Sequence, residues 1–298
     1  MAPIPCKCCG GASLPFATVD FSRSCVDRPE PVFAPAGEPV PYVRCERCGF
    51  LFTCHFDALT AAEMANKIYN ADYIKADPEF ADSRPRFFAA MLQEWLGPAS
   101  NGFAALDFGG GRGLLAQLVR AAGFPEFASY DPYFDTTPVP ATRFDLVTAF
   151  EVVEHTRDPL ATFREMLALL RPNGAVLFST LLQPRRVQPD WWYMAPRNGH
   201  VSLHSRHSLA RLADAVNCGF VSISAGLHLF HRSPANAATR ALVRRHARPI
   251  LRFASQHGIA AWFDASRQVA GLGMPRAALE PRHVLRAALC QIGVPIAR

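Results

Sequence analysis

The chain has 298 residues, half of them apolar and 19% charged, with a formal net charge of +6. This length allows one sizeable hydrophobic core plus a smaller module, and the composition is ordinary for a globular protein. No apolar stretch approaches the length needed to span a bilayer, and the N-terminus lacks a secretory pattern. We therefore expect a cytoplasmic protein without membrane contact, whose nine cysteines are thiols or metal ligands rather than disulfides.

Residues 1–57 contain two matching Cys-x-x-Cys-Gly motifs. Each motif places two thiolates on a tight turn, and four thiolates suit tetrahedral zinc with no open coordination position. A module of this size has little core of its own, so the metal would contribute much of its stability. Cys8 is an alternative member of the first pair. The predicted ligands of a structural zinc are Cys6, Cys9, Cys45 and Cys48.

Residues 58–100 read as a helical lid or linker. In RPRFFAAMLQEWLG the apolar residues recur at helical spacing. Tyr69 and Tyr73 are four residues apart, which on one helix places both rings on the same face.

Residues 101–232 alternate strands with helices, which is typical of an α/β fold with a parallel sheet and crossover helices. The candidate strands are FAALDFG, FASYD, FDLVTAF, GAVLFST, FVSISAG and LHLFHR. The clearest helices are LLAQLVRAAG, DPLATFREMLALLR and SRHSLARLADAVN.

A glycine-rich turn, LDFGGGRG, follows the first of these strands directly and precedes a helix. Glycine permits close backbone approach to a ligand, and the N–H groups of the following helix face the turn. Asp107 ends the first strand and Asp131 closes the second, where a carboxylate can accept hydrogen bonds from ribose hydroxyls. The same layout serves a nicotinamide cofactor, but the turn lacks the Gly-Lys-Ser/Thr ending of a phosphate loop.

The run FDLVTAFEVVEHTRDPLATFREMLALLRPNGAVLFST, joined to LDFGGGRG, resembles the class I S-adenosylmethionine-dependent methyltransferases, within them the ubiquinone-type O-methyltransferases. The resemblance implies a Rossmann-like sheet and S-adenosylmethionine as cofactor. It implies that the glycines admit the methionine end, that Asp107 orients its amino group and that Asp131 holds the ribose. The cofactor-binding set is Asp107, Gly109, Gly111, Gly113, Asp131 and Glu151.

The chain departs from that family between the second and fourth strands. Only twelve residues separate Asp131 from Phe144, too few for the helix and third strand that the family usually inserts there. We expect a shortened third-strand region, and the residues that contact the adenine are left open.

Two further segments bear on catalysis. The cysteine module ahead of this core is similar to that of the deoxysugar C-methyltransferases, although the chain lacks their large C-terminal domain. NGHVSLHS resembles their His-Glu-His-hydrophobe-Ser stretch, which implies His200 as general base, with Gly199 where the family has glutamate. Related enzymes place a tyrosine of the preceding helical segment over the reacting atoms, for which we favour Tyr73.

Other residues near these segments have two interpretations each. Glu154 and His155 either face the methyl-transfer region or cap the helix that begins near Asp158, since an acid is stabilised at a helix N-terminus. Trp191 and Trp192 either stack on an acceptor or pack as a lid on the core.

Residues 233–298 form a basic extension with helical character. They carry ten arginines, no lysine and two acids, a net charge of +8. A basic tail favours an anionic partner, but an Arg-rich helical appendage on the core is the simpler interpretation.

The sequence as a whole favours methyl transfer to a small polar metabolite, such as a nucleotide-linked sugar or a natural-product precursor. An RNA or protein methyltransferase that docks through the zinc module and the tail is the first alternative. Against it, basic and aromatic residues do not interleave as in a nucleic-acid module. A catalytically silent scaffold is the second alternative.

Overall fold

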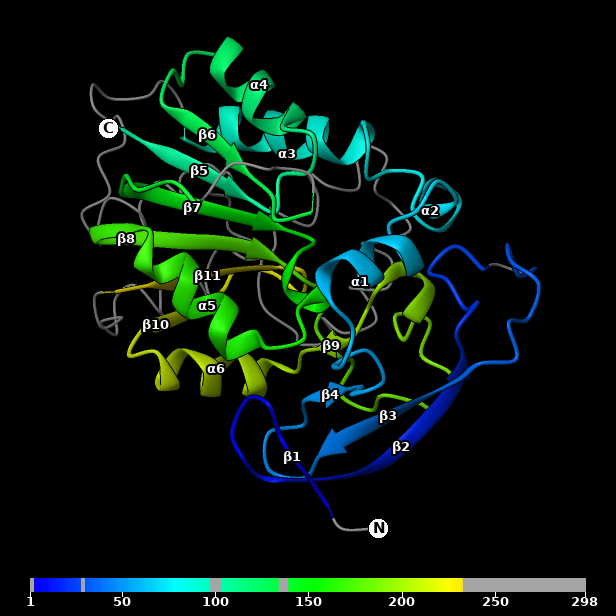
Figure 1. Cartoon of the computed structure of the whole chain (residues 1–298). Helices are drawn as coiled ribbons and strands as arrows, with labels where there is room; N and C mark the ends of the chain where they lie inside the picture. The colour runs from blue at the N-terminus through cyan, green and yellow to red at the C-terminus, as the bar shows by residue number, and fades with distance from the viewer. Residues whose placement is uncertain (1–2, 28–29, 97–102, 134–138, 233–298) are drawn as a thin grey trace, which may run out of the picture.

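The structure, a computed structural model, describes residues 3–27, 30–96, 103–133 and 139–232. The predicted C-terminal extension, residues 233–298, lies outside the described residues. Two sheets organise the chain: a six-stranded sheet and a smaller five-stranded sheet below it (Figure 1). Within the described residues, no helix combines the length and the apolar character needed to cross a membrane.

The large sheet has the order β10-β11-β8-β7-β5-β6. Strands β6, β5, β7 and β8 run parallel, whereas β11 and β10 are antiparallel additions. Every candidate strand of residues 101–232 is found, which confirms the α/β prediction. The bounds are β5 Ala105–Phe108, β6 Phe127–Tyr130, β7 Phe144–Phe150, β8 Leu170–Ser179, β10 Gly219–Ser222 and β11 Leu227–His231.

Helices cover both faces of this sheet (Figure 1). The strands β7 and β8 bury side chains on both faces, as parallel strands between helix layers do. Leu146 and Leu177 belong to the core with α3 and α4, while Val147 and Phe178 belong to the core with α5 and α6. The bounds are α3 Ser83–Leu96, α4 Leu114–Ala121, α5 Pro159–Ala168 and α6 Arg206–Ala215.

The third-strand region is short, as the sequence predicts. Among the described residues no strand lies between β6 and β7, so β6 forms the edge of the sheet. This edge position leaves the loop after β6 beside the glycine turn.

The small sheet contains four N-terminal strands and one strand from much later in the chain. Its order is β1-β2-β3-β4-β9, and β9 pairs antiparallel with β4. The cysteine module is therefore completed by the methyltransferase-like segment, a connection that no local pattern indicates. The bounds are β1 Ile4–Pro5, β2 Ala12–Asp20, β3 Pro39–Cys45, β4 Leu51–Phe52 and β9 Ser202–Leu203.

The predicted helical segment 58–100 is interrupted. It comprises α1 (Ala61–Lys67), α2 (Tyr73–Ala76) and α3. The expectation that Tyr69 and Tyr73 share one helix face is wrong, because the chain leaves α1 before Tyr69. Their rings nevertheless meet edge to face at 5.2 Å between centroids.

Candidate functional site

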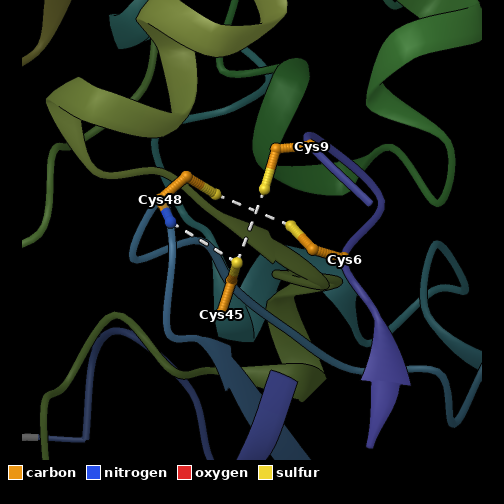
Figure 2. Close-up of side chains that lie close together, drawn as sticks. All are labelled: Cys6, Cys9, Cys45 and Cys48. Atoms are coloured by element: carbon orange, nitrogen blue, oxygen red, sulfur yellow. Dashed lines mark hydrogen bonds between the residues drawn. The ribbon is translucent and has the colours of Figure 1, made fainter. Parts of the chain in front are cut away.

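The four predicted cysteine ligands come together in the structure (Figure 2). Cys6 and Cys9 lie in the turn between β1 and β2, and Cys45 and Cys48 lie at the turn between β3 and β4, and we call these two turns the first and second knuckle. The Sγ atoms of Cys6 and Cys48 are 3.6 Å apart, and those of Cys9 and Cys45 are also 3.6 Å apart. A tetrahedral zinc with Zn–S bonds of about 2.3 Å separates its sulfurs by about 3.8 Å. The four thiols therefore have the spacing of a closed tetrathiolate site.

The knuckles explain why these sulfurs converge. Gly10 and Gly49 have φ values of +68° and +71°, in the left-handed region that favours glycine. Cys8 does not belong to the cluster, and its N–H lies 3.4 Å from Cys6 Sγ. The alternative in which Cys8 replaces a member of the first pair is therefore not supported.

The glycine turn links β5 to α4 and has an open, ligand-facing backbone. Gly109, Gly111 and Gly113 all have positive φ values, of +72°, +56° and +76°. A Cβ on Gly111 would meet nothing within 4 Å, so this glycine faces free space. Gly110 lies between the spaced glycines of the motif and is enclosed instead. A Cβ there would lie 2.6 Å from Asp107 Oδ2.

Both predicted acids lie at this turn. Asp107 Oδ1 accepts a hydrogen bond from Thr148 Oγ1 at 2.9 Å, and burial raises the pKa of this carboxyl to about 7. Asp131 accepts from the N–H of Gly111 at 2.9 Å and from the N–H of Tyr133 at 2.8 Å. A carboxylate has further lone pairs, so Asp131 can still accept from a ligand hydroxyl.

A cavity of about 1250 Å³ opens at the carboxyl ends of β5, β6 and β7. In open α/β sheets this edge is where ligands bind. Asp107, the first three glycines of the turn, Asp131 and Glu151 line the cavity on the sheet side. Gly113 is not among the lining residues; it begins α4 as its N-cap.

Five aromatic rings form a further wall of the cavity, and three of them come from the helical segment 58–100. Tyr69 contacts both Tyr73 and Tyr133, at 5.2 and 5.1 Å between ring centroids. Phe88 of α3 stacks on Phe150 of β7 at 3.9 Å. All five rings line the cavity, so the segment predicted as a lid or linker contributes to the lining of the site.

One ion pair in this wall was missed by the sequence reasoning. Arg84 donates two hydrogen bonds of 2.7 Å to the two carboxylate oxygens of Asp77. Both residues line the cavity and tie α2 to α3. Their spacing of seven residues is compatible with a helix, but nothing in the sequence shows that they flank a ligand site.

Glu151 has the strained backbone typical of functional positions, with a φ of +55°. Its Oε1 accepts a 2.6 Å hydrogen bond from Ser179 Oγ. Burial raises the pKa of Glu151, and the nearby Arg84 guanidinium opposes that shift.

The predicted base His200 lies behind the cavity wall rather than on it. It is 4% exposed, and its ring centroid is 5.0 Å from that of His155. His155 is the histidine that lines the cavity, and burial lowers its pKa to about 4. The sequence singles out both histidines, but it does not show which of them lines the cavity.

Glu154 is fully buried and accepts a 2.7 Å hydrogen bond from the Tyr193 hydroxyl. The interpretation of Glu154 and His155 as helix caps is wrong, because Asp158 caps α5 by accepting from the N–H of Ala161. Trp191 and Trp192 pack on the ring of Tyr193, and neither lines the cavity.

Comparison with known proteins places this site in a family. Residues 77–223 match the family model described as a methyltransferase domain. The ubiquinone biosynthesis O-methyltransferase of Histophilus somni is 44% identical over 45 residues, which are 15% of this chain and 19% of that protein. The same enzyme of Vibrio vulnificus is 49% identical over 41 residues, 14% of this chain and 17% of that protein. The alignments thus span less than a fifth of these relatives' length.

Solved structures show a weaker likeness. An O-methyltransferase family protein from Burkholderia thailandensis has a TM-score of 0.41 and 18% identity, over 54% of this chain and 61% of that one. The mitomycin 7-O-methyltransferase MmcR has a TM-score of 0.41 and 14% identity, over 59% and 60% of the two chains. The segment that matches the family model, residues 77–223, holds β5 to β10 and the glycine turn with both acids. This chain therefore carries a class I S-adenosylmethionine-dependent methyltransferase domain.

Proposed function

We propose that the chain methylates a small polar metabolite, with S-adenosylmethionine as the methyl donor. The observation that carries the proposal is the cavity beside the glycine turn, lined by Asp107 and Asp131 within the matched domain. Ligand pockets commonly have volumes of about 300–1000 Å³. A cavity of about 1250 Å³ therefore has room for a cofactor and an acceptor together.

The residues of the turn suit this cofactor. The free space at Gly111 admits the methionine end, and the Asp107 carboxylate accepts from its ammonium group. Asp131 holds the ribose hydroxyls, and Glu151 adds a carboxylate at the end of β7. Gly113 begins α4 and directs the N-terminal end of that helix toward the turn. When bound, the cofactor supplies a methyl group on a positively charged sulfur.

The chain itself contributes positioning and exclusion of water. Holding the acceptor in line with the methyl group supplies much of the acceleration of such a transfer. Tyr69, Tyr73 and Tyr133 line the cavity and enclose the side where the acceptor binds. The bound cofactor would supply the methyl group and leave as the neutral thioether, and the proton of the acceptor would pass to solvent.

The two histidines take different positions in this proposal. His155 lines the cavity and contacts the acceptor. His200 lies behind it and acts through it, as a positioning residue, rather than as the direct base that the resemblance implies. The substrate class, including a sugar or a natural-product precursor, belongs to the proposal.

We further propose that Cys6, Cys9, Cys45 and Cys48 bind one structural zinc. The sulfur spacing fits, and four thiolates fill the coordination sphere. The metal would fix the knuckle that carries Lys7, whose ammonium pairs with Asp57 at 2.6 Å on the rim of the cavity.

Calorimetric titration of S-adenosylmethionine and S-adenosylhomocysteine tests the main proposal. Binding with a Kd near 1 µM corresponds to about −8 kcal/mol. We expect Asp131→Asn to weaken it by about 1.5–3 kcal/mol, the value of a hydrogen bond to a charged group. Asp214→Asn, an exposed acid on α6, is the control. Folded, zinc-loaded protein that binds neither compound contradicts the proposal.

A further inference from the structure

A group of exposed arginines surrounds the second knuckle, and none of them lines the cavity. They come from three separate segments: the end of β3 with the knuckle, residues 44–49; the stretch after β8, residues 183–187; and the start of α6, residues 205–208. We call this surface the arginine patch, and its members are Arg44, Arg47, Arg185, Arg186 and Arg206.

Two of these segments meet at Gly49 of the knuckle. Arg44 Nη2 lies 3.5 Å from the position that a Cβ on Gly49 would take, and Ser205 Oγ lies 3.4 Å from the same position. Figure 1 shows the strand just before α6, β9, beside the strand just after the knuckle, β4. The guanidinium of Arg44 therefore lies close to the start of α6, whose first residue is Arg206. The first turn of α6 contains no acidic residue, so both arginines add to the positive potential of that helix end.

The stretch after β8 reaches the same glycine. Gln183 Nε2 donates to the backbone carbonyl of Gly49 at 2.8 Å, and Arg185 and Arg186 follow within three residues. Three residues span at most about 11 Å, so the backbone of both arginines stays close to the knuckle. Arg47 belongs to the knuckle itself. Only the fold assembles this surface, because no single segment carries more than two of the five arginines.

The charge of the patch is not cancelled by neighbouring acids. Apart from Arg206, none of these arginines forms an ion pair with a described residue. Glu46 is the acidic residue of the three segments. A zinc-loaded tetrathiolate would add two negative charges beneath the surface. Five guanidinium groups still exceed these three charges, so the patch is positive with or without the metal.

We propose that the arginine patch docks a nucleic acid through its phosphodiester backbone. The planar guanidinium group matches two phosphate oxygens at once, and all five cations of the patch are arginines. Several arginines around one knuckle suit a partner whose negative charges repeat along a chain. Contacts to phosphates carry no sequence information, so the docking is independent of base sequence.

Other occupants suit this surface less well. The chain's own extension, residues 233–298, has a net charge of +8 and is repelled by a positive patch. Binding to a bilayer surface requires buried apolar area as well as charge. Leu14, the cross-strand partner of Arg44, is an exposed leucine beside the patch, but the three segments of the patch present no exposed large apolar side chain.

Fluorescence anisotropy with the full-length protein tests the proposal. The probes are a fluorescein-labelled RNA of about 20 nucleotides in mixed sequence and the DNA of the same sequence. We expect both to bind, and the affinity to fall steeply as salt is raised from about 0.05 to 0.2 M. Each arginine that contacts a phosphate contributes about 0.7 to the slope of log affinity against log salt, or about 5-fold in affinity at 0.1 M salt.

Paired variants locate the binding on the patch. Arg44→Gln/Arg47→Gln and Arg185→Gln/Arg186→Gln each remove two charges and should weaken binding about 25-fold at 0.1 M salt. The matched control, Arg143→Gln/Arg164→Gln, removes two exposed arginines outside the patch and should bind like the wild type. Residues 233–298 are the same in every protein. Thermal unfolding identifies a variant that fails to fold, and the second patch variant then decides.

The proposal is overturned if the wild type binds neither strand at about 0.05 M salt, or if the control loses as much affinity as the patch variants. Displacement of the RNA by poly-L-glutamate at equal charge would assign the patch to an acidic protein instead. Binding to phosphatidylserine vesicles but to neither strand would assign it to a membrane. The proposed function is tested separately, because the patch variants should bind S-adenosylmethionine like the wild type.

Discussion

Cys45→Ser replaces one thiolate of the cysteine cluster and should remove most of the cluster's affinity for zinc. Structural zinc sites of this kind bind with apparent free energies of about 10–16 kcal/mol. Shared equally among four ligands, this is roughly 2.5–4 kcal/mol per thiolate, or about 100- to 1000-fold in affinity. Cys45 is 1% exposed at the end of β3, so neither water nor another side chain replaces its sulfur easily.

The perturbation should also reach the methyltransferase domain. The Gln183 side chain donates to the backbone carbonyl of Gly49 at 2.8 Å, and the Ser205 hydroxyl donates to that of Cys48 at 2.6 Å. These bonds join the second knuckle to the segments before and after β9. Loss of zinc should therefore loosen β9 and lower the thermal stability of the whole chain.

The assay is the zinc content per chain together with zinc retention against a competing chelator. Cys54→Ser is the matched control, since Cys54 is an exposed thiol of the same module outside the cluster. We expect the control to keep one zinc per chain and Cys45→Ser to lose it. The reasoning is refuted if the wild type purifies folded without metal, or if both variants hold zinc equally.

Two further predictions concern the glycine turn. Gly110→Ala places a Cβ 2.6 Å from Asp107 Oδ2 and should weaken cofactor binding about 10- to 150-fold by displacing that carboxylate, the loss of one charged hydrogen bond. In Gly111→Ala the new Cβ meets no atom, but the φ of +56° should lower the free energy of unfolding by about 1–2 kcal/mol. If calorimetry finds that both variants lose the same affinity for the cofactor, this contrast between them is contradicted. Burial raises the pKa of Asp107 to about 7 from 3.8, so the folded state holds this proton more tightly than the unfolded chain. The stabilisation is complete below about pH 4 and is lost, by up to about 4 kcal/mol, as the pH rises to 7. The free energy of unfolding in urea, measured across this pH range, should depend less on pH in Asp107→Asn than in the wild type. An equal pH dependence in both proteins would contradict this prediction.

Much of the fold follows from local patterns. Alternating strand and helix segments predict the large sheet, and each candidate strand is found within a few residues of its expected place. Twelve residues between Asp131 and Phe144 leave room for a loop but not for a helix and a strand, a matter of chain length alone. The glycine turn and the paired cysteine motifs are likewise short-range signals.

The arrangement of the site depends on contacts between distant segments. His155 and His200 are 45 residues apart in sequence, and Tyr193 contacts both Glu154 and His200. Which histidine lines the cavity therefore depends on contacts between distant segments. The pairing of β9 with β4 is of the same kind. No periodicity in either segment encodes such a partner.

The sequence by itself determined the α/β class, the place of the glycine turn and the two Cys-x-x-Cys-Gly motifs whose thiols cluster, because each depends on residue type at fixed local spacing. Tertiary structure alone decided that Gly110 is the enclosed glycine, that Arg84 and Asp77 line the cavity, and that Glu154 is buried with a free oxygen. The physical reason is that burial and cavity shape arise from side chains brought together by the whole fold, and these contacts have no signature within any one segment.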